Sequence, residues 1–241
     1  MRTLVVLPTY NEISNIDPML RALRSTVPDA HVLVVDDASP DGTAARADQL
    51  AAELDRVAIL RRPSKSGLGG AYRAGFGWGL ARGFDHFVEI DCDFSHDPAA
   101  LPALLAAAQI ADVVIGSRYV AGGSIPRWSW RRRLLSRGGN VYASTVLGLG
   151  VADATSGYRV YAARALAAMD YDTVRADGYG FQIEMTYRAR RAGLVITEVP
   201  ISFTDRTRGE SKMSGAIVAE ALVLVTGWAL VRPWRALLRR R

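Results

Sequence analysis

The chain has 241 residues, of which 49% are hydrophobic and 22% charged, a balance typical of folded proteins that excludes a disordered or fibrous chain. The length allows one large α/β domain or two small ones, and the single cysteine, Cys92, excludes an internal disulfide framework and favours a reducing compartment. A net charge of +6 favours an anionic partner, either a phosphorylated substrate or a membrane surface, whereas no helix-turn-helix, zinc-finger or ribonucleoprotein pattern points to nucleic acid.

Short apolar runs alternate with segments of helical periodicity through the first half of the chain. Strands are predicted at residues 3–7, 31–35, 57–60, 87–90 and 113–115, and helices at residues 13–25, 43–54 and 70–82. Short buried strands separated by helices predict an α/β fold with a mostly parallel, Rossmann-like sheet flanked by helices. Ligands of such sheets bind beyond the carboxyl ends of the strands, so the residues after each strand are the first candidates for chemistry.

Four of the predicted strands run directly into polar segments. These segments are Pro8-Thr9-Tyr10-Asn11-Glu12, Asp36-Asp37-Ala38-Ser39-Pro40-Asp41-Gly42-Thr43, Asp91-Cys92-Asp93-Phe94-Ser95-His96-Asp97-Pro98 and Gly116-Ser117-Arg118-Tyr119. Because the carboxyl ends of parallel strands meet at one edge of a sheet, we expect these segments to line one crevice.

Asp91 and Asp93 follow an apolar strand and are separated by one residue. Two such carboxylates can converge on Mg²⁺ or Mn²⁺, hard cations that take oxygen ligands and also coordinate substrate phosphates. Aspartates also favour turns and helix caps, so this pair alone leaves both interpretations open. Ser95 can add a third oxygen ligand, whereas His96 and Asp97 are assigned to the turn and cap that follow.

Asp36 and Asp37 open a segment rich in turn residues, and Ser39, Pro40 and Gly42 are assigned to that turn. A carboxylate at a strand end also accepts hydrogen bonds from a nucleoside. Several acidic strand ends in one sheet repel each other unless a cation or donor groups compensate them. The set as a whole therefore favours a nucleotide and metal site over isolated turns.

These segments resemble the family 2 glycosyltransferases with the GT-A fold, and most closely the dolichol-phosphate mannose synthases and their bacterial polyprenol-phosphate counterparts. The resemblance runs in order from about Leu4 to Lys212. It includes Gly67-Leu68-Gly69, Gly116-Ser117-Arg118-Tyr119, Ser136-Arg137-Gly138, Gly178-Tyr179-Gly180-Phe181-Gln182-Ile183-Glu184, and Asp205-Arg206 followed by Gly209-Glu210-Ser211-Lys212.

The resemblance implies a role for each matching residue. The guanosine-binding wall comprises Pro8, Tyr10, Glu12, Val35 and Asp37. The metal and diphosphate centre comprises Asp91 and Asp93, with Cys92 between them and Ser95 where some relatives have Gln. The basic positions at the donor and acceptor phosphates are Arg118, Arg206 and Lys212, and Arg132 aligns best with a further acceptor-phosphate arginine. Asp93, Arg118 and Arg132 are the residues expected to act in catalysis.

The resemblance implies transfer of mannose from GDP-mannose to a polyprenyl monophosphate, with inversion at the sugar. Hydroxyl-acceptor relatives often carry a base in a Glu-Asp pair, and this chain contains no Glu-Asp pair. A lipid phosphate is already anionic near neutral pH and needs no base, so the missing pair fits that acceptor. UDP-glucose or another sugar donor with the same acceptor is the first alternative, and a non-catalytic nucleotide- or nucleic-acid-binding module is the second.

Residues 1–212 are assigned to the glycosyltransferase domain and residues 213–241 to an apolar helix with a basic tail. Residues 215–231 are almost all apolar but are interrupted by Glu220, which makes them marginal for a bilayer span. An interfacial or partner-binding helix is favoured, with Trp228 and Trp234 near the headgroups and the terminal arginines on anionic lipid. A helix packed on the domain and a true membrane span are the alternatives. The positive end favours the cytoplasmic face of a membrane, and a membrane-protein partner is plausible.

Overall fold

The computed structural model describes residues 1–205 and 224–229 of the chain. The strands of this part are β1 (Thr3–Thr9), β2 (His31–Asp36), β3 (Val57–Arg61), β4 (His86–Glu89), β5 (Val113–Ser117), β6 (Arg159–Ala162) and β7 (Ile196–Pro200). Its α-helices are α1 (Ile16–Thr26), α2 (Thr43–Glu53), α3 (Leu68–Leu80), α4 (Leu101–Ala107), α5 (Trp130–Leu147), α6 (Ala163–Ala168) and α7 (Gly178–Arg191). Residues 224–229 are also helical.

The strands form one seven-stranded sheet in the order β3-β2-β1-β4-β6-β5-β7. The pairs β1–β2, β1–β4, β2–β3 and β5–β7 are parallel, whereas β6 runs antiparallel to both of its neighbours. The carboxyl ends of the other six strands and the amino end of β6 therefore lie along the same edge. The mostly parallel α/β sheet predicted from the sequence is confirmed.

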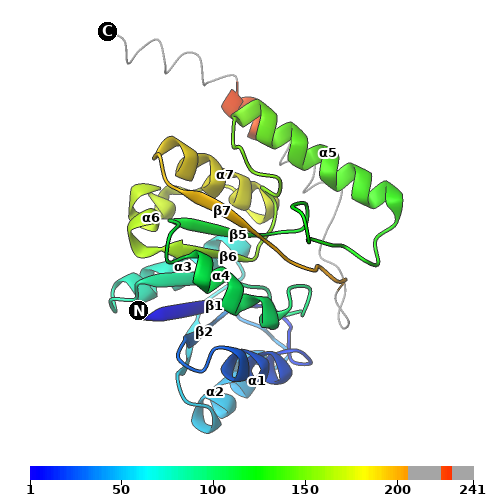
Figure 1. Cartoon of the computed structure of the whole chain (residues 1–241). Coiled ribbons are helices and arrows are strands. Elements are labelled where there is room, and N and C mark those ends of the chain that lie inside the picture. The colour runs from blue at the N-terminus through cyan, green and yellow to red at the C-terminus, as the bar shows by residue number, and fades with distance from the viewer. Residues whose placement is uncertain (206–223, 230–241) are drawn as a thin grey trace.

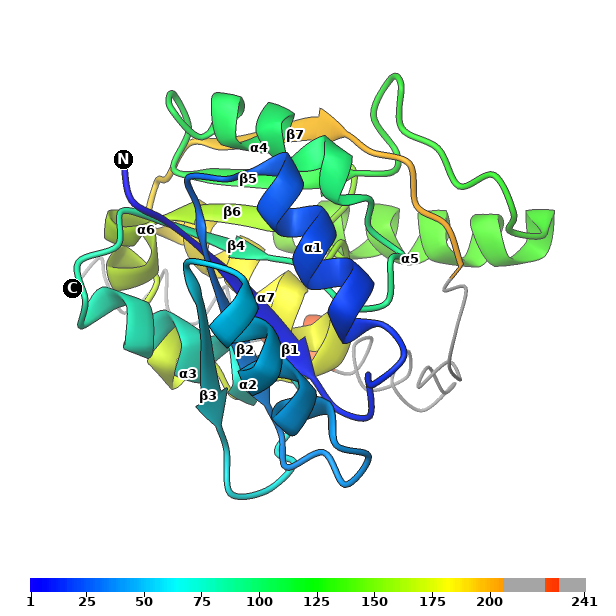
Figure 2. The ribbon, with the colours of Figure 1, turned by 90° about the horizontal axis from the view of Figure 1, so that it is seen from below.

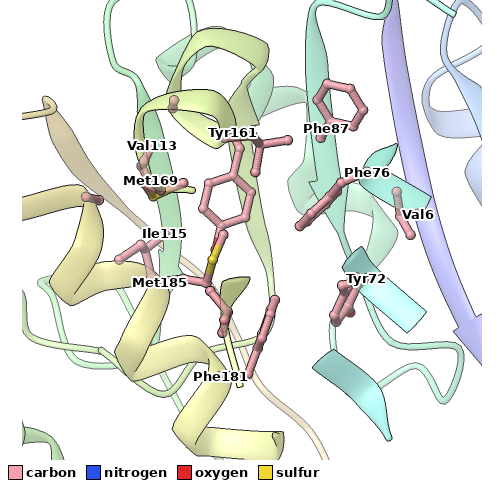
Figure 3. Close-up of a cluster of buried hydrophobic side chains, with 14 of the residues drawn as sticks. Val6, Tyr72, Phe76, Phe87, Val113, Ile115, Tyr161, Met169, Phe181 and Met185 are labelled. Atoms are coloured by element: carbon pink, nitrogen blue, oxygen red, sulfur yellow. The ribbon is translucent and has the colours of Figure 1, made fainter. Parts of the chain in front are cut away.

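Helices cover both faces of the sheet (Figures 1 and 2). Successive strand residues point to opposite faces, so Leu4 and Val6 of β1 join one core cluster while Val5 and Leu7 join the other. The first cluster contains buried residues of α3, α6 and α7, and the second contains those of α1, α2 and α4. Figure 3 shows aromatic rings in the first cluster, where the Phe76 ring centroid lies 5.8 Å from that of Tyr161.

The structure refines the predicted elements without removing any of them. The helix expected from residue 13 begins at Ile16, because Asn11 has a left-handed backbone (φ +58°) and Glu12 accepts turn hydrogen bonds from the next residues. The helix expected from residue 70 begins two residues earlier, at Leu68. The antiparallel β6 and the edge strand β7 were not among the predicted strands.

Helix α5 projects beyond the rest of the described fold (Figures 1 and 2). Only Asn140, Ala143 and Leu147 of its eighteen residues are buried. Residues 224–229 are the described part of the segment 215–231, and they pack on α7 and α5: Trp228 stacks on Tyr187, and Thr226 is hydrogen-bonded to Tyr142. In the described part of the chain, no helix is long and apolar enough to cross a bilayer. The rest of 215–231, including Glu220, and Trp234 lie outside the described residues.

Close packing of α3 on the sheet gives a stability prediction. A Cβ at Gly79 would lie 2.5 Å from Phe87 Cε1 and 2.6 Å from Leu4 Cδ2, both in fully buried side chains. Gly79→Ala is therefore expected to lower the free energy of unfolding by about 1–3 kcal/mol. Gly138→Ala in α5 is the matched control, because nothing lies within 4 Å of its added Cβ, and alanine there is expected to be neutral or to stabilise by up to ~1 kcal/mol. Urea unfolding measures the stability of both variants. An unfolding midpoint of Gly79→Ala equal to that of the wild type would contradict the tight contact.

Candidate active site

A cavity of about 440 Å³ opens at the edge of the sheet where the parallel strands end. Most of the predicted site residues within the described part of the chain line it. They are Pro8, Tyr10, Glu12, Asp37, Asp91, Cys92, Asp93, Ser95 and Arg118. The structure thus brings together the four polar segments that are far apart in the sequence.

The two aspartates at the end of β2 have different surroundings. Asp36 closes the turn, since Oδ2 accepts the Ser39 amide at 2.9 Å and Oδ1 accepts the Ser39 hydroxyl at 2.6 Å. Asp37 lines the cavity and accepts hydrogen bonds from Arg62 Nη1 at 2.6 Å and from the Ser66 amide at 3.1 Å. Its charge is therefore compensated by Arg62, and it is the carboxylate of this pair that faces a ligand.

Tyr10 and Glu12 form the wall next to Asp37. Lys65 lies over the Tyr10 ring with Nζ 4.0 Å from the centroid, and both residues line the cavity. Glu12 is held in place because its Oε2 accepts a hydrogen bond from Asn15 at 2.8 Å. An aromatic face, a cation and an oriented carboxylate suit the base and ribose of a nucleotide.

The segment after β4 supplies the acidic part of the cavity. Asp93 Oδ1 accepts a hydrogen bond from the Ser95 amide at 2.9 Å, so a tight turn holds Asp93 and Ser95 on the wall beside Asp91. In the described chain, no group of three or more His, Cys, Asp or Glu side chains is arranged to hold a metal ion. Two carboxylates and a hydroxyl nevertheless fit Mg²⁺ or Mn²⁺, which commonly take only one or two carboxylates and complete their shell with substrate phosphates and water.

His96 and Asp97 follow this turn but differ in role. Asp97 caps the short 3₁₀ helix Pro98–Ala100 by accepting the Ala99 amide at 2.9 Å, as predicted. His96 is instead buried on the cavity wall between the rings of Tyr158 and Phe203. Its Nδ1 lies 3.6 Å from Asp91 Oδ2, and burial lowers the pKa of His96 to about 4, so the ring is neutral at neutral pH.

Arg118 is the buried cation of the cavity. Asp153 holds it through Nε and Nη2, each at 2.7 Å. Burial alone would lower the pKa of Arg118, but Asp153 raises it above its ordinary value, so the guanidinium stays charged. A buried, charged guanidinium in a cavity is suited to bind a phosphate.

Arg132 lies in the first turn of α5 and is not among the residues that line the cavity. Its guanidinium lies 3.9 Å from the centroid of the Trp128 ring, and that of Arg118 lies 5.9 Å from the same centroid. Asp205 accepts hydrogen bonds from both Arg132 Nη1 and Trp128 Nε1 at 2.9 Å. The fold therefore places the two arginines expected at the acceptor phosphate around one aromatic ring.

The remaining predicted site residues are placed differently or fall outside this part of the structure. Val35 is fully buried, packs in the core and does not line the cavity. Arg206 and Lys212 lie outside the described residues.

The structure adds residues that sequence reasoning missed. Lys65 follows β3, so the strand-end rule applied to that strand would have found it. The cavity wall formed by Thr155, Ser156 and Gly157 precedes β6, and no strand-end rule finds it because β6 is antiparallel. Asp177 approaches Gly67 so closely that a Cβ there would lie 1.6 Å from the carboxylate; this, with a φ of +81°, explains the glycine.

Comparisons with known proteins show the family of the chain. Residues 4–169 match the family described as Glycosyl transferase family 2. An undecaprenyl-phosphate mannosyltransferase of Micrococcus luteus is 53% identical over 100% of this chain and 99% of its own length. A polyprenol monophosphomannose synthase of Mycolicibacterium smegmatis is 49% identical over 95% of this chain and 87% of its own.

Solved structures share the fold at lower identity. TarS of S. aureus in complex with UDP-GlcNAc superposes with a TM-score of 0.62 at 17% identity, covering 96% of this chain and 67% of that chain. The mannosyltransferase PcManGT of Pyrobaculum calidifontis, in complex with GDP-Man and Mn²⁺, superposes with a TM-score of 0.59 at 18% identity, covering 95% and 64%. With the family match over most of the chain, these findings show that the chain belongs to glycosyl transferase family 2 and is a glycosyltransferase with a GT-A-like fold.

Proposed function

We propose that the chain transfers mannose from GDP-mannose to a polyprenyl monophosphate, with inversion at the anomeric carbon. The names of the two relatives at 53% and 49% identity support the sugar and the lipid acceptor. The complex of PcManGT with GDP-Man and Mn²⁺ supports the donor and the metal. The single observation that carries the acceptor is the buried, charged Arg118 in the same cavity as Asp91 and Asp93.

The donor is placed along the acidic side of the cavity. Tyr10, Glu12 and Asp37 bind the guanosine, and the diphosphate extends towards Asp91 and Asp93. These carboxylates, with Ser95, would hold Mg²⁺ or Mn²⁺, and the bound cation would stabilise the charge that grows on the leaving diphosphate. Lys65, beside Tyr10 on the cavity wall, is a further cation available to that charge.

The acceptor phosphate is placed at Arg118, with Arg132 next to it. The phosphate is anionic near neutral pH and attacks the anomeric carbon directly, so no side chain has to remove a proton. This agrees with the absence of a Glu-Asp pair from the chain. The arginines hold and orient the nucleophile, and attack opposite the leaving diphosphate inverts the sugar.

A lipid acceptor requires contact with a membrane, and the outer face of α5 is suited to it. Four large apolar residues of α5 are exposed by 58–69%, and Arg131, Arg132, Arg133 and Arg137 lie among them in the sequence; they are Trp130, Leu134, Leu135 and Val141. Apolar side chains interleaved with cations suit the interface of an anionic bilayer, and Arg132 on the same helix would place that interface next to the acceptor site.

Membrane contact by α5 is tested with a matched pair of double variants. Leu134→Ser with Leu135→Ser is expected to reduce binding to vesicles containing anionic lipid at least about fivefold, because two exposed apolar groups are lost from the face. The control is Ile110→Ser with Val195→Ser, which changes residues exposed by 83% and 55%. Ile110 lies three residues before β5 and Val195 directly before β7, at the opposite edge of the sheet. Co-sedimentation measures both, and equal losses would contradict a specific role of α5.

The donor is tested by supplying purified protein with polyprenyl phosphate, Mg²⁺ and either labelled GDP-mannose or labelled UDP-glucose, and following label into the organic phase. Metal-dependent labelling from GDP-mannose supports the proposal. Labelling from UDP-glucose alone would leave the acceptor in place but overturn the donor. Labelling from neither, with the nucleotide still bound, would favour a binding module without this activity.

A further inference from the structure

The guanidinium of Arg118 is fixed on two of its edges. Asp153, which is fully buried, accepts hydrogen bonds from Arg118 Nε and Nη2 at 2.7 Å each and from the Arg118 backbone amide at 3.0 Å. A carboxylate that takes two parallel N–H groups sets the plane of the guanidinium. The described hydrogen bonds of Arg118 use N, Nε and Nη2, so Nη1 is the guanidinium nitrogen for which the described part of the chain supplies no hydrogen bond, and Arg118 lines the cavity.

Asp153 is itself anchored to the sheet. Glu198 of β7 accepts the amide of Asp153 at 2.9 Å and that of Ala152 at 2.8 Å. The loop that carries Asp153 is therefore held at the sheet edge by two hydrogen bonds to one carboxylate. Through Asp153, the orientation of the Arg118 guanidinium is therefore fixed relative to the sheet.

A second set of hydrogen bonds joins Arg118 to α5. Arg118 Nη2 donates to the Thr155 hydroxyl at 2.7 Å, and Asn140 of α5 donates to the same hydroxyl at 3.1 Å. Asn140 Oδ1 accepts the Thr155 amide at 3.2 Å. Asn140 is 1% exposed, in a helix that otherwise buries only Ala143 and Leu147. Asn140 is thus the one polar side chain among the three buried residues of α5, and its amide group both donates to and accepts from Thr155.

We propose that Asn140 and Asp153 are positioning residues, which fix Arg118 from the α5 side and from the sheet side so that its remaining donor faces the acceptor phosphate. This inference rests on the proposed role of Arg118. It gives α5 a second task besides membrane contact: the helix that touches the lipid surface is hydrogen-bonded, through Thr155, to the cation that receives the lipid's phosphate.

The test uses farnesyl phosphate as a short acceptor and measures its dissociation constant by titration calorimetry, together with the KM values of acceptor and donor. Asn140→Ala is expected to weaken farnesyl phosphate binding about three- to tenfold, the effect of one or two neutral hydrogen bonds, and to raise the acceptor KM alike while the donor KM stays unchanged. Thr145→Ala, an exposed position on the same helix, is the control and is expected to change neither value.

The decisive arm is the double variant with Arg118→Ala. If Asn140 acts through Arg118, Asn140→Ala adds nothing to the loss already caused by Arg118→Ala, whereas an independent or merely structural effect adds in full. Circular dichroism checks folding; if Asn140→Ala does not fold, Asn140→Ser, a smaller change, takes its place in the same cycle.

The outcomes separate this inference from the proposed function. Wild-type protein that neither binds farnesyl phosphate nor transfers mannose to polyprenyl phosphate overturns both. Wild-type protein that binds and transfers, with unchanged acceptor binding in Asn140→Ala or with full additivity in the double variant, overturns the positioning role and leaves the proposed function intact.

Discussion

Replacement of Asp93 by alanine is expected to lower the rate of mannose transfer at least about a hundredfold at saturating donor and acceptor. Asp93 lines the cavity in a turn closed by the Ser95 amide, where its carboxylate would hold the cation that stabilises the leaving diphosphate. Loss of one such electrostatic contact typically costs a factor of about 10²–10³ in rate. Binding of Mn²⁺ in the presence of GDP, measured by electron paramagnetic resonance, is expected to weaken in parallel.

Asp97→Ala is the control for this prediction, since Asp97 belongs to the same loop. Its carboxylate accepts the Ala99 amide and caps a 3₁₀ helix, so the substitution is expected to cost about 1 kcal/mol of stability while transfer stays within a few-fold of wild type. Equal losses of activity in the two variants would show that the loop, not the Asp93 carboxylate, matters.

Replacement of Glu89 by glutamine is expected to stabilise the protein progressively as pH rises. Glu89 is fully buried in β4, and burial raises its pKa from 4.5 to about 8. Gln182 donates a hydrogen bond to its Oε2 at 2.9 Å, whereas Glu89 Oε1 and Gln182 Oε1 have no hydrogen-bond partner among the described residues. A protonated carboxyl carries a hydrogen-bond donor at this buried position, as a glutamine amide does at any pH.

The sign of the effect follows from proton linkage. Between about pH 4.5 and 8 the folded state keeps the Glu89 proton and the unfolded state does not, so wild-type stability falls as pH rises through this window. The difference between Glu89→Gln and wild type is therefore expected to grow from pH 5 to pH 8, by an upper limit on the order of 3–4 kcal/mol. Urea unfolding in metal-free buffer measures it. The same substitution at Glu53, a half-exposed residue of α2, is the control, and a difference that stays constant with pH for Glu89→Gln would rule out the buried proton.

Much of the fold could be predicted from the sequence because periodicity reports local structure. The expected elements up to β5 are all present, and their ends shift by one to three residues where turn geometry decides, as at Asn11 before α1. The strand β6 was missed because it pairs antiparallel between β4 and β5, a placement decided by the packing of the whole sheet. The exposure of α5 also depends on packing, since its sequence mixes apolar and basic residues without a clear buried face.

For the site too, local sequence patterns found some residues, whereas those placed by tertiary packing were missed. The residues directly after β1, β2, β4 and β5 were found, because the carboxyl ends of those strands meet at one edge. His96 on the cavity wall and Asp153 behind Arg118 were not, because their positions depend on which segments meet in three dimensions. Val35 shows the converse: its place in the motif suggested a ligand contact, while its side chain fills the core.

The central claim is that the nucleophile is a lipid phosphate held by Arg118, and one measurement tests it most directly. Wild-type protein is incubated with GDP-mannose and Mg²⁺ and with either undecaprenyl phosphate or undecaprenol, and the lipid products are identified by mass spectrometry. The account predicts a mannosyl phosphodiester from undecaprenyl phosphate, no product from undecaprenol, and at least a hundredfold less product from Arg118→Ala. Transfer to the free alcohol, or no lipid product while GDP-mannose is consumed, would contradict it.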